Sequence, residues 1–274
     1  MKIEGEKMSI CFIVGHGKSA KGGYDSGAVY GNYHEYKIAK EIAKYAYEYY
    51  NATYTESAAL MNYNGTLYLN ERITEANKKR YDFIAEIHLN AGGGYGSEVY
   101  YSKGSSKGKA IAAGVSKKIA LALGIKDRGA KTRVGTSGRD YFGIIRQTSA
   151  ESILVECAFI DTSDLDKLKT AEGQKICGIA TAQAVAAARG IKAKGAVTPA
   201  TKPAPEPTTK VWYFNKCNAK HTSIVNALKS LGFNSSFSYR KQIAAANGIK
   251  AYIGTSKQNT TLLSLLKQGK LIKP

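Results

Sequence analysis

Apolar, strand-like segments alternate with amphipathic, helix-like segments over the first 190 residues of this chain. The segments expected as strands are 9–15, 82–88, 97–102 and 152–160, and those expected as helices are 33–50, 69–79, 107–123 and 171–189. A short β-like piece, 52–55, lies between the first two predicted helices. Strands that alternate with helices predict an α/β fold, in which helices cover both faces of one sheet.

A cluster of prolines divides the chain. Four of the five prolines lie close together, at Pro199, Pro203, Pro205 and Pro207. The surrounding segment, 191–210, consists mostly of Pro, Ala, Thr and Lys, which is typical of an extended, semi-rigid linker. We therefore predict two domains, 1–190 and 211–274, joined by this linker.

The second predicted domain is small and mainly helical. Its aliphatic residues recur at helical spacing in three stretches, each followed by a glycine, at 224–231, 243–247 and 262–266. The domain holds ten Lys and Arg residues and no Asp or Glu, in a chain whose net charge is +19. This excess predicts a polyanionic partner, which charge alone leaves open among nucleic acid, acidic lipid and the anionic polymers of a bacterial wall.

Composition excludes several classes of protein. With 43% hydrophobic and 22% charged residues the chain has enough apolar material for a core, which excludes disorder throughout. Four cysteines in 274 residues do not make a disulfide framework. The apolar run near the N-terminus, 10–14, is too short for a secretory signal or a membrane span. We therefore expect a soluble product of a cytoplasm, without membrane insertion.

Two histidines and two glutamates are predicted to meet at one edge of the sheet. His16 and His88 each end a predicted strand, Glu35 opens the first predicted helix, and Glu156 lies late in a strongly apolar strand. Functional residues gather at the carboxyl ends of strands in such sheets. A catalytic zinc site needs three protein ligands and a nearby carboxylate. There is no HExxH motif, so the residues alone leave open whether they bind a metal or have structural roles.

Three other features near these residues are less well supported by the sequence as parts of a catalytic site. Cys157 could act as a nucleophile, but strand alternation points it away from Glu156 and predicts a buried core thiol. His34 is an alternative ligand, although adjacent side chains on the first turn of a helix diverge from Glu35. The glycines at 92–94 lack the Lys and Ser/Thr of a phosphate loop and predict a flexible loop beside the site.

Short motifs over residues 8–190 occur in an order that is known from one enzyme family. They are VGHG at 14–17, DSGA at 25–28, LNER at 69–72, AN at 76–77, EIHLNA at 86–91, GSEVY at 96–100, RGAK at 128–131 and LVECAF at 154–159. Together with Glu35, this arrangement resembles the zinc-dependent N-acetylmuramoyl-L-alanine amidases of the amidase type 3 family. The resemblance implies the mixed sheet of that fold. It also implies one zinc ion per catalytic domain, held by His16, Glu35 and His88, with Glu156 as the catalytic carboxylate. Where Cys157 stands, the family often has a serine.

The second domain carries a resemblance of its own. Residues 222–273, with QIAAANGI at 242–249 and GTSKQNT at 254–260, resemble the small cell-wall-binding domains of amidase endolysins from Bacillus and Clostridium phages. We therefore expect a phage endolysin that is made in the host cytoplasm and reaches the wall after holin-mediated release. Its expected partners are peptidoglycan and the associated anionic wall polymers, not nucleic acid, and we also consider oligomerisation through this domain.

The expected reaction is hydrolysis, by zinc-activated water, of the amide bond between N-acetylmuramic acid and L-alanine of the stem peptide. Two other functions fit the same sequence. One is a zinc peptidase that cuts within the stem peptide, which differs in the bond that is cut. The other is a non-catalytic basic protein that binds the wall or nucleic acid, which would need no zinc.

Overall fold

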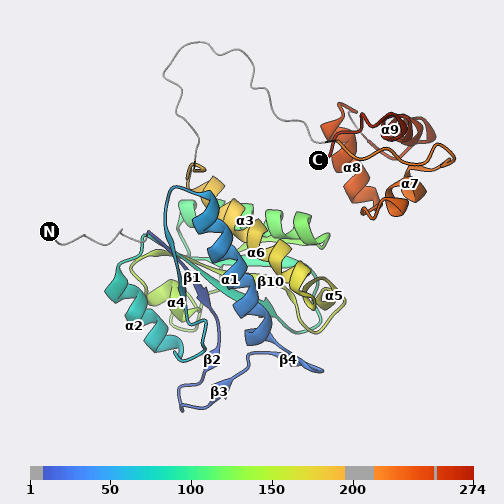
Figure 1. The fold of residues 1–274 in the computed structure, drawn as a ribbon. Coiled ribbons are helices and arrows are strands. Elements are labelled where there is room, and N and C mark those ends of the chain that lie inside the picture. Colours follow the sequence, from blue (N-terminus) through green and yellow to red (C-terminus); the bar gives the residue numbers. More distant parts are fainter. Residues whose placement is uncertain (1–8, 195–212, 250–251) are drawn as a thin grey trace, which may run out of the picture. The chain divides into compact units, whose positions relative to one another are not determined.

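The computed structural model describes residues 9–194, 213–249 and 252–274, and the chain forms two compact units, Met1–Val197 and Thr198–Pro274 (Figure 1). Beyond Lys194, the predicted linker 191–210 lies outside the described residues. Residues 191–194 pack on the first unit, where the Lys194 backbone N–H donates to the Thr53 carbonyl over 2.7 Å. None of the described helices combines the length and apolar character that a membrane span requires.

The first unit is built on a six-stranded sheet with the strand order β6-β1-β7-β10-β8-β9. The bounds of these strands are β6 Ala58–Met61, β1 Ile10–Val14, β7 Phe83–Asn90, β10 Glu151–Phe159, β8 Ser97–Tyr101 and β9 Asp127–Lys131. The first four strands in this order are parallel, β8 is antiparallel to β10, and β9 is parallel to β8. The mixed sheet that was expected is therefore confirmed, and the carboxyl ends of β1, β7 and β10 meet at one edge.

Helices cover both faces of the sheet, as predicted (Figure 1). One face packs against α1 Glu35–Thr53, α3 Ser106–Leu123, α5 Leu165–Leu168 and α6 Ala171–Ala188, and the other against α2 Leu69–Lys79 and α4 Gly143–Gln147. The alternation of β1 shows how the sequence divides the core. Phe12 and Val14 pack under the first group of helices, whereas Cys11 and Ile13 pack under the second.

Two short segments differ from the sequence prediction. Residues 52–55 were expected to be β-like, but α1 continues to Thr53; only Tyr54 is extended, where it forms an isolated antiparallel β-bridge with Ala193. Helical hydrogen bonding overrides the β propensity of residues 52–53. The strand that pairs with β1 is β6, which begins at Ala58. The edge strand β9 was not predicted, because its sequence, DRGAK, has no apolar run.

Two small hairpins connect β1 to α1. They are formed by β2 Gly17–Lys18 with β3 Tyr24–Asp25, and by β4 Val29–Tyr30 with β5 Tyr33–His34. Three exposed tyrosines lie on them, Tyr24, Tyr30 and Tyr33, with exposed fractions of 57%, 52% and 37%.

The second unit is small and mainly helical, which confirms the prediction. Its helices are α7 Ile224–Ser230, α8 Phe237–Ala246 and α9 Ser256–Gln268. They enclose a separate core whose largest members include Phe214, Ile224, Leu228, Ile243, Tyr252, Leu262, Leu266 and Leu271. Of the aromatic residues in this unit, Phe214 and Tyr252 are buried, Tyr213 and Phe237 are each 48% exposed, and Trp212 lies outside the described residues.

Candidate metal centre

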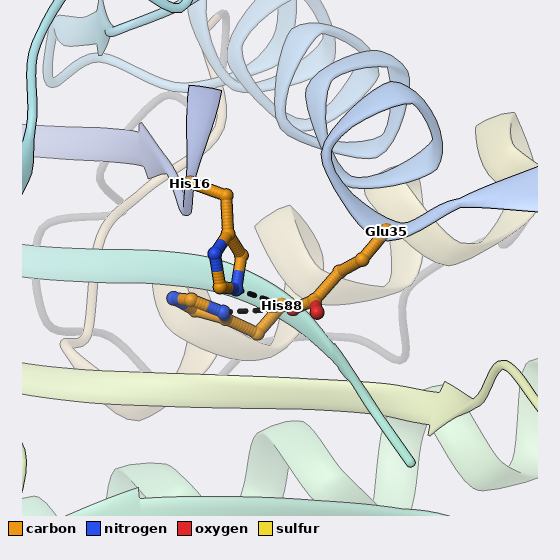
Figure 2. A group of neighbouring side chains, drawn as sticks. All are labelled: His16, Glu35 and His88. Carbon is orange, nitrogen blue, oxygen red and sulfur yellow. Dashed lines mark hydrogen bonds and ion pairs between the residues drawn. The ribbon is translucent and has the colours of Figure 1, made fainter. Parts of the chain in front are cut away.

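The three predicted metal ligands meet at the carboxyl edge of β1 and β7 (Figure 2). His16 follows β1, Glu35 is the first residue of α1, and His88 lies near the end of β7. Their side chains point toward one another from these three elements, and one ligand atom from each lies within 4.8 Å of the other two. Because the three residues are far apart in the sequence, the parallel strands and the first helix bring them together.

His16 adopts a left-handed backbone conformation, with a φ of 61°, which is unusual for a residue with a bulky side chain. Its carbonyl accepts hydrogen bonds from Asn62 Nδ2 over 2.7 Å and from an Arg72 terminal nitrogen over 3.1 Å. These two bonds hold the turn in place, so the chain leaves β1 with the His16 imidazole directed at Glu35.

Glu35 lies between the two histidines. Its Oε1 is 3.2 Å from His16 Nε2 and 2.9 Å from His88 Nδ1, and it also accepts the Leu89 N–H over 3.0 Å. The other oxygen, Oε2, accepts the Ala28 N–H over 2.9 Å. Burial raises the pKa of Glu35, but the hydrogen bonds from the two imidazoles outweigh it and hold the pKa well below its ordinary value. The group is therefore an anion at all ordinary pH values.

The histidines carry the complementary charge. Burial lowers the pKa of His88, but its contacts with Glu35 and Glu86 outweigh burial and raise the pKa to about 10. Burial lowers the pKa of His16, but the hydrogen bond and charge of Glu35 together with the hydrogen bond to Asp25 outweigh it, so the pKa is also raised. A divalent cation in the same place would supply positive charge beside these buried carboxylates. Two imidazole nitrogens and one carboxylate are the donor set of a catalytic zinc ion, so the residues fit such a metal.

Asp25 orients His16, a role that the sequence did not suggest for it. Asp25 Oδ2 lies 2.9 Å from His16 Nδ1, and Oδ1 accepts the Gly27 N–H over 3.0 Å. A carboxylate on the far nitrogen of a metal-binding histidine fixes the tautomer and the direction of the ring. This contact leaves His16 Nε2 as the nitrogen that faces Glu35.

We expect Asp25→Asn to weaken zinc binding by about 10- to 100-fold, because an amide orients the His16 ring without the carboxylate's charge. Zinc affinity can be measured by competition with a chromogenic chelator. Asp140→Asn is the matched control, since Asp140 also accepts hydrogen bonds from nearby groups, Ser102 and the Lys103 N–H, but lies outside the metal cluster. Equal affinities in wild type and Asp25→Asn would contradict the orienting role.

A buried ion pair lies behind His88. Arg72 Nε donates to Glu86 Oε1 over 2.9 Å, and the two side chains are only 6% and 1% exposed. Glu86 Oε2 is 3.4 Å from His88 Nε2, at ion-pair distance but without the geometry of a hydrogen bond. Burial raises the pKa of Glu86, but the charge and hydrogen bond of Arg72 and the nearby His88 together outweigh it, so the pKa lies below its ordinary value. Glu86 is therefore a positioning residue behind His88, with one oxygen bonded to Arg72 and the other at ion-pair distance from His88.

Glu156 differs from Glu86 in this respect. It lies on β10 directly beside His88 in the register of β7 and β10. Its Oε2 is buried and has no hydrogen-bond partner among the described residues. Burial raises the pKa of Glu156 to about 7. A carboxyl group that is unpaired and poised near neutral pH, next to a metal-ligand cluster, is suited to general acid–base chemistry.

The remaining candidates lie outside this centre. Cys157 is fully buried in the core on the other face of the sheet, as strand alternation predicted. His34 is not part of the ligand cluster, and its ring packs near that of Tyr24. The loop at 92–94 is tied down rather than loose, since the Gly92 and Gly93 N–H groups both donate to Asp161 Oδ2.

Comparisons with known proteins show which family the chain is similar to. Residues 10–187 match the family described as N-acetylmuramoyl-L-alanine amidase. N-acetylmuramoyl-L-alanine amidase LytC of Bacillus subtilis (strain 168) is 35% identical over 157 residues, which cover 55% of this chain and 30% of LytC. The chain therefore spans less than a third of this curated relative.

Solved structures show the same fold. Cwp6 from Clostridium difficile has a TM-score of 0.59 at 32% identity, covering 66% of this chain and 29% of Cwp6. The catalytic domain of the CD27L endolysin, described as targeting Clostridia difficile, has a TM-score of 0.52 at 27% identity, covering 64% of this chain and 97% of that domain. The family match spans more than half of the chain and includes His16, Glu35, His88 and Glu156, so the chain belongs to the N-acetylmuramoyl-L-alanine amidase family, Amidase_3.

Proposed function

We propose that this chain is a zinc-dependent peptidoglycan amidase. It would hydrolyse the amide bond between the lactyl group of N-acetylmuramic acid and L-alanine of the stem peptide. The observation that supports this most directly is the convergence of His16, Glu35 and His88 within 4.8 Å, beside a glutamate with a buried, unpartnered oxygen. A non-catalytic binding protein would have no use for such a cluster, because buried charged groups of this kind are costly to maintain.

The chemistry follows from the placement of the side chains. His16, Glu35 and His88 would hold the zinc ion, which when bound polarises a carbonyl and lowers the pKa of water. Glu156 would accept a proton from the attacking water and return it to the nitrogen of the departing L-alanine. The raised pKa of Glu156 suits it to both halves of this transfer. Asp25 and Glu86 would keep the two imidazoles in register while the reaction proceeds.

Product analysis tests the proposed reaction. Peptidoglycan digested with the purified protein should show new N-terminal L-alanine and intact glycan strands, because only the lactyl amide is cut. New N-termini inside the stem peptide would favour the zinc peptidase instead. Chelator treatment should stop the digestion and added zinc should restore it, whereas activity that resists metal removal would contradict the metal mechanism.

We further propose that the protein acts as a phage endolysin, made in the host cytoplasm and released to the wall by a holin. The likeness to the CD27L endolysin domain and the two-unit organisation support this role. Expression inside a susceptible Gram-positive host tests it. Lysis should require co-expression of a holin, whereas lysis without a holin would show that the protein reaches the wall by another route.

The second unit is proposed to bind the bacterial wall. Residues 211–274 carry ten basic and no acidic residues, and they fold around a core of their own. Nine of these ten basic residues would contribute to a diffuse positive field: Lys216, Lys220, Arg240, Lys241, Lys250, Lys257, Lys267, Lys270 and Lys273. Phe237 and Ile253 add exposed apolar surface, at 48% and 72% exposure, which a purely electrostatic tether would not need. An ordered domain with these side chains suits a specific wall receptor. Oligomerisation through this unit stays a prediction.

We expect a fluorescent fusion of residues 206–274 to decorate only some Gram-positive cells and to stay bound at moderately high salt. Exposed charges are screened beyond about 8 Å at physiological ionic strength, so purely electrostatic binding would weaken steeply as salt is added. Fluorescence microscopy over a salt series separates the two cases. Indiscriminate coating of anionic surfaces that salt abolishes would reduce the unit to a charged tether.

A further inference from the structure

A row of polar side chains crosses the sheet from the metal cluster toward the β9 edge. In the strand register, His88 on β7 is opposite Glu156 on β10, Glu156 is opposite Glu98 on β8, and Glu98 is opposite Gly129 on β9. Arg128 precedes Gly129, so its backbone lies two strands away from that of Glu156. Neighbouring strands are about 4.8 Å apart, which places the two backbones roughly 10 Å from each other.

Arg128 is held firmly at one end. Its Nε donates to Glu98 Oε2 over 2.5 Å, and Glu98 is itself only 3% exposed. The other oxygen of Glu98 accepts hydrogen bonds from Asn90 Nδ2 over 2.8 Å and from the Tyr100 hydroxyl over 2.9 Å. Three hydrogen bonds thus hold the Glu98 carboxylate in place, and it anchors the Arg128 guanidinium.

The planar face of the Arg128 guanidinium also has a contact, with an aromatic ring. Arg128 Cζ lies 5.0 Å from the centre of the Phe159 ring. Phe159 is confined by the loop in front of it, because a side-chain carbon at Gly94 would come within 2.4 Å of its ring. The Arg128 side chain therefore has one set direction.

The terminal nitrogens of Arg128 have no described partner. The Arg128 side chain remains 28% exposed, and its described hydrogen bond uses Nε alone. A guanidinium that is fixed at Nε and stacked on a ring still offers two terminal NH₂ groups, whose planar geometry matches a carboxylate. An arginine that served only to neutralise Glu98 would not need to present these donors to solvent on the catalytic edge of the sheet.

We propose that Arg128 binds a free carboxylate of the stem peptide, in the residues directly after L-alanine; this rests on the amidase function proposed above. An extended peptide advances about 3.3 Å per residue, so a chain cut beside Glu156 reaches Arg128 at its second or third residue. The stem peptide is acidic in this region unless its carboxylates are amidated. The hairpins on the His16 side carry the exposed tyrosines Tyr24, Tyr30 and Tyr33, whose rings are suited to stacking on sugars. If the glycan binds on that side, the stem peptide extends toward β9.

The test compares defined muropeptide substrates that differ only in one group. One has free carboxylates at its second and third residues, a second carries a carboxamide at the second residue, and a third carries it at the third residue. The wild-type chain, loaded with zinc, should prefer the free carboxylate by about 10- to 100-fold in kcat/KM, the range of a hydrogen bond between charged groups. The position at which amidation lowers kcat/KM identifies which carboxylate is bound.

Arg128→Met should bring the preference close to unity, mainly by slowing the carboxylate substrate. Arg128→Lys keeps a charge beside Glu98 but lacks the planar fork, so it should fold and still lose most of the preference. Arg139→Met is the matched control: Arg139 is an exposed arginine whose neighbour Asp140 bonds Ser102 and Lys103, beyond the opposite end of β8, and this variant should keep the wild-type preference.

A purely structural role for Arg128 would give a different result. Loss of the Glu98 contact would then reduce kcat/KM for all three substrates equally, and that result would overturn the proposal. Equal rates on the three substrates in the wild type would overturn it too. Calorimetric binding of the free stem peptides to the metal-free chain gives an independent readout. A carboxylate preference there that Arg128→Met abolishes would support the binding site even if the amide bond were not the one cut.

Discussion

Replacement of His88 by alanine should abolish zinc binding and amidase activity together. Two ligand atoms would remain from the cluster, and catalytic zinc sites use three protein ligands. Zinc should therefore fall from about one ion per chain to a small fraction in a dialysed sample. The rate of wall digestion should fall by more than about 10²-fold, because metal catalysis contributes several kcal/mol. Metal content can be measured by atomic emission, and digestion by loss of turbidity.

His221→Ala is the control for this experiment. His221 lies in the second unit, where its Nε2 is 3.0 Å from the Ser230 hydroxyl, and it is not part of the ligand cluster. Its zinc content and catalytic rate should match those of the wild type. Full zinc occupancy in a folded His88→Ala variant would show that the metal is bound elsewhere.

Glu156→Gln should separate metal binding from turnover. The amide keeps the shape of the side chain but cannot accept a proton, so zinc content should stay near one per chain while kcat drops by about 10²- to 10⁴-fold. The same assay of metal content and digestion gives both numbers. Folding should be preserved, because the Glu156 Oε2 has no described hydrogen bond to lose.

Glu151→Gln tests whether the effect belongs to this position on β10. Glu151 begins the same strand and accepts a hydrogen bond from the Ser105 hydroxyl, at the end of β10 away from the metal cluster. It should retain wild-type turnover. If Glu156→Gln kept its activity, the proton transfer would have to be made by another group. Glu86 would be a poor substitute, because Arg72 and His88 already engage it.

Periodicity was enough to predict most of the first unit. Alternation in β1 and β10 identified buried strands, and it correctly sent Cys157 and Glu156 to opposite faces, because successive side chains of a strand must point in opposite directions. The prediction of a β-like piece was wrong at 52–53, and it missed β9. At 52–53 the helical hydrogen bonds of α1 outweigh the β propensity of the segment. At β9 the outcome depends on a distant partner, because that segment is a strand only through its pairing with β8.

The same distinction applies to the candidate site. His16, His88 and Glu156 could be singled out from the sequence, because polar residues at the ends of apolar strands stand out against their neighbours. The roles of their partners could not be predicted in the same way: Asp25, Arg72, Glu86, Glu98 and Arg128 lie in motifs of the family resemblance, but nothing local shows which group each of them contacts. Their roles arise only when the strand order β7-β10-β8-β9 and the turn at His16 bring separate segments together. The sequence by itself determined which residues could act, through local pattern and burial cost. The tertiary structure decided which charges face each other, because electrostatic contacts depend on distances between segments that no local pattern encodes.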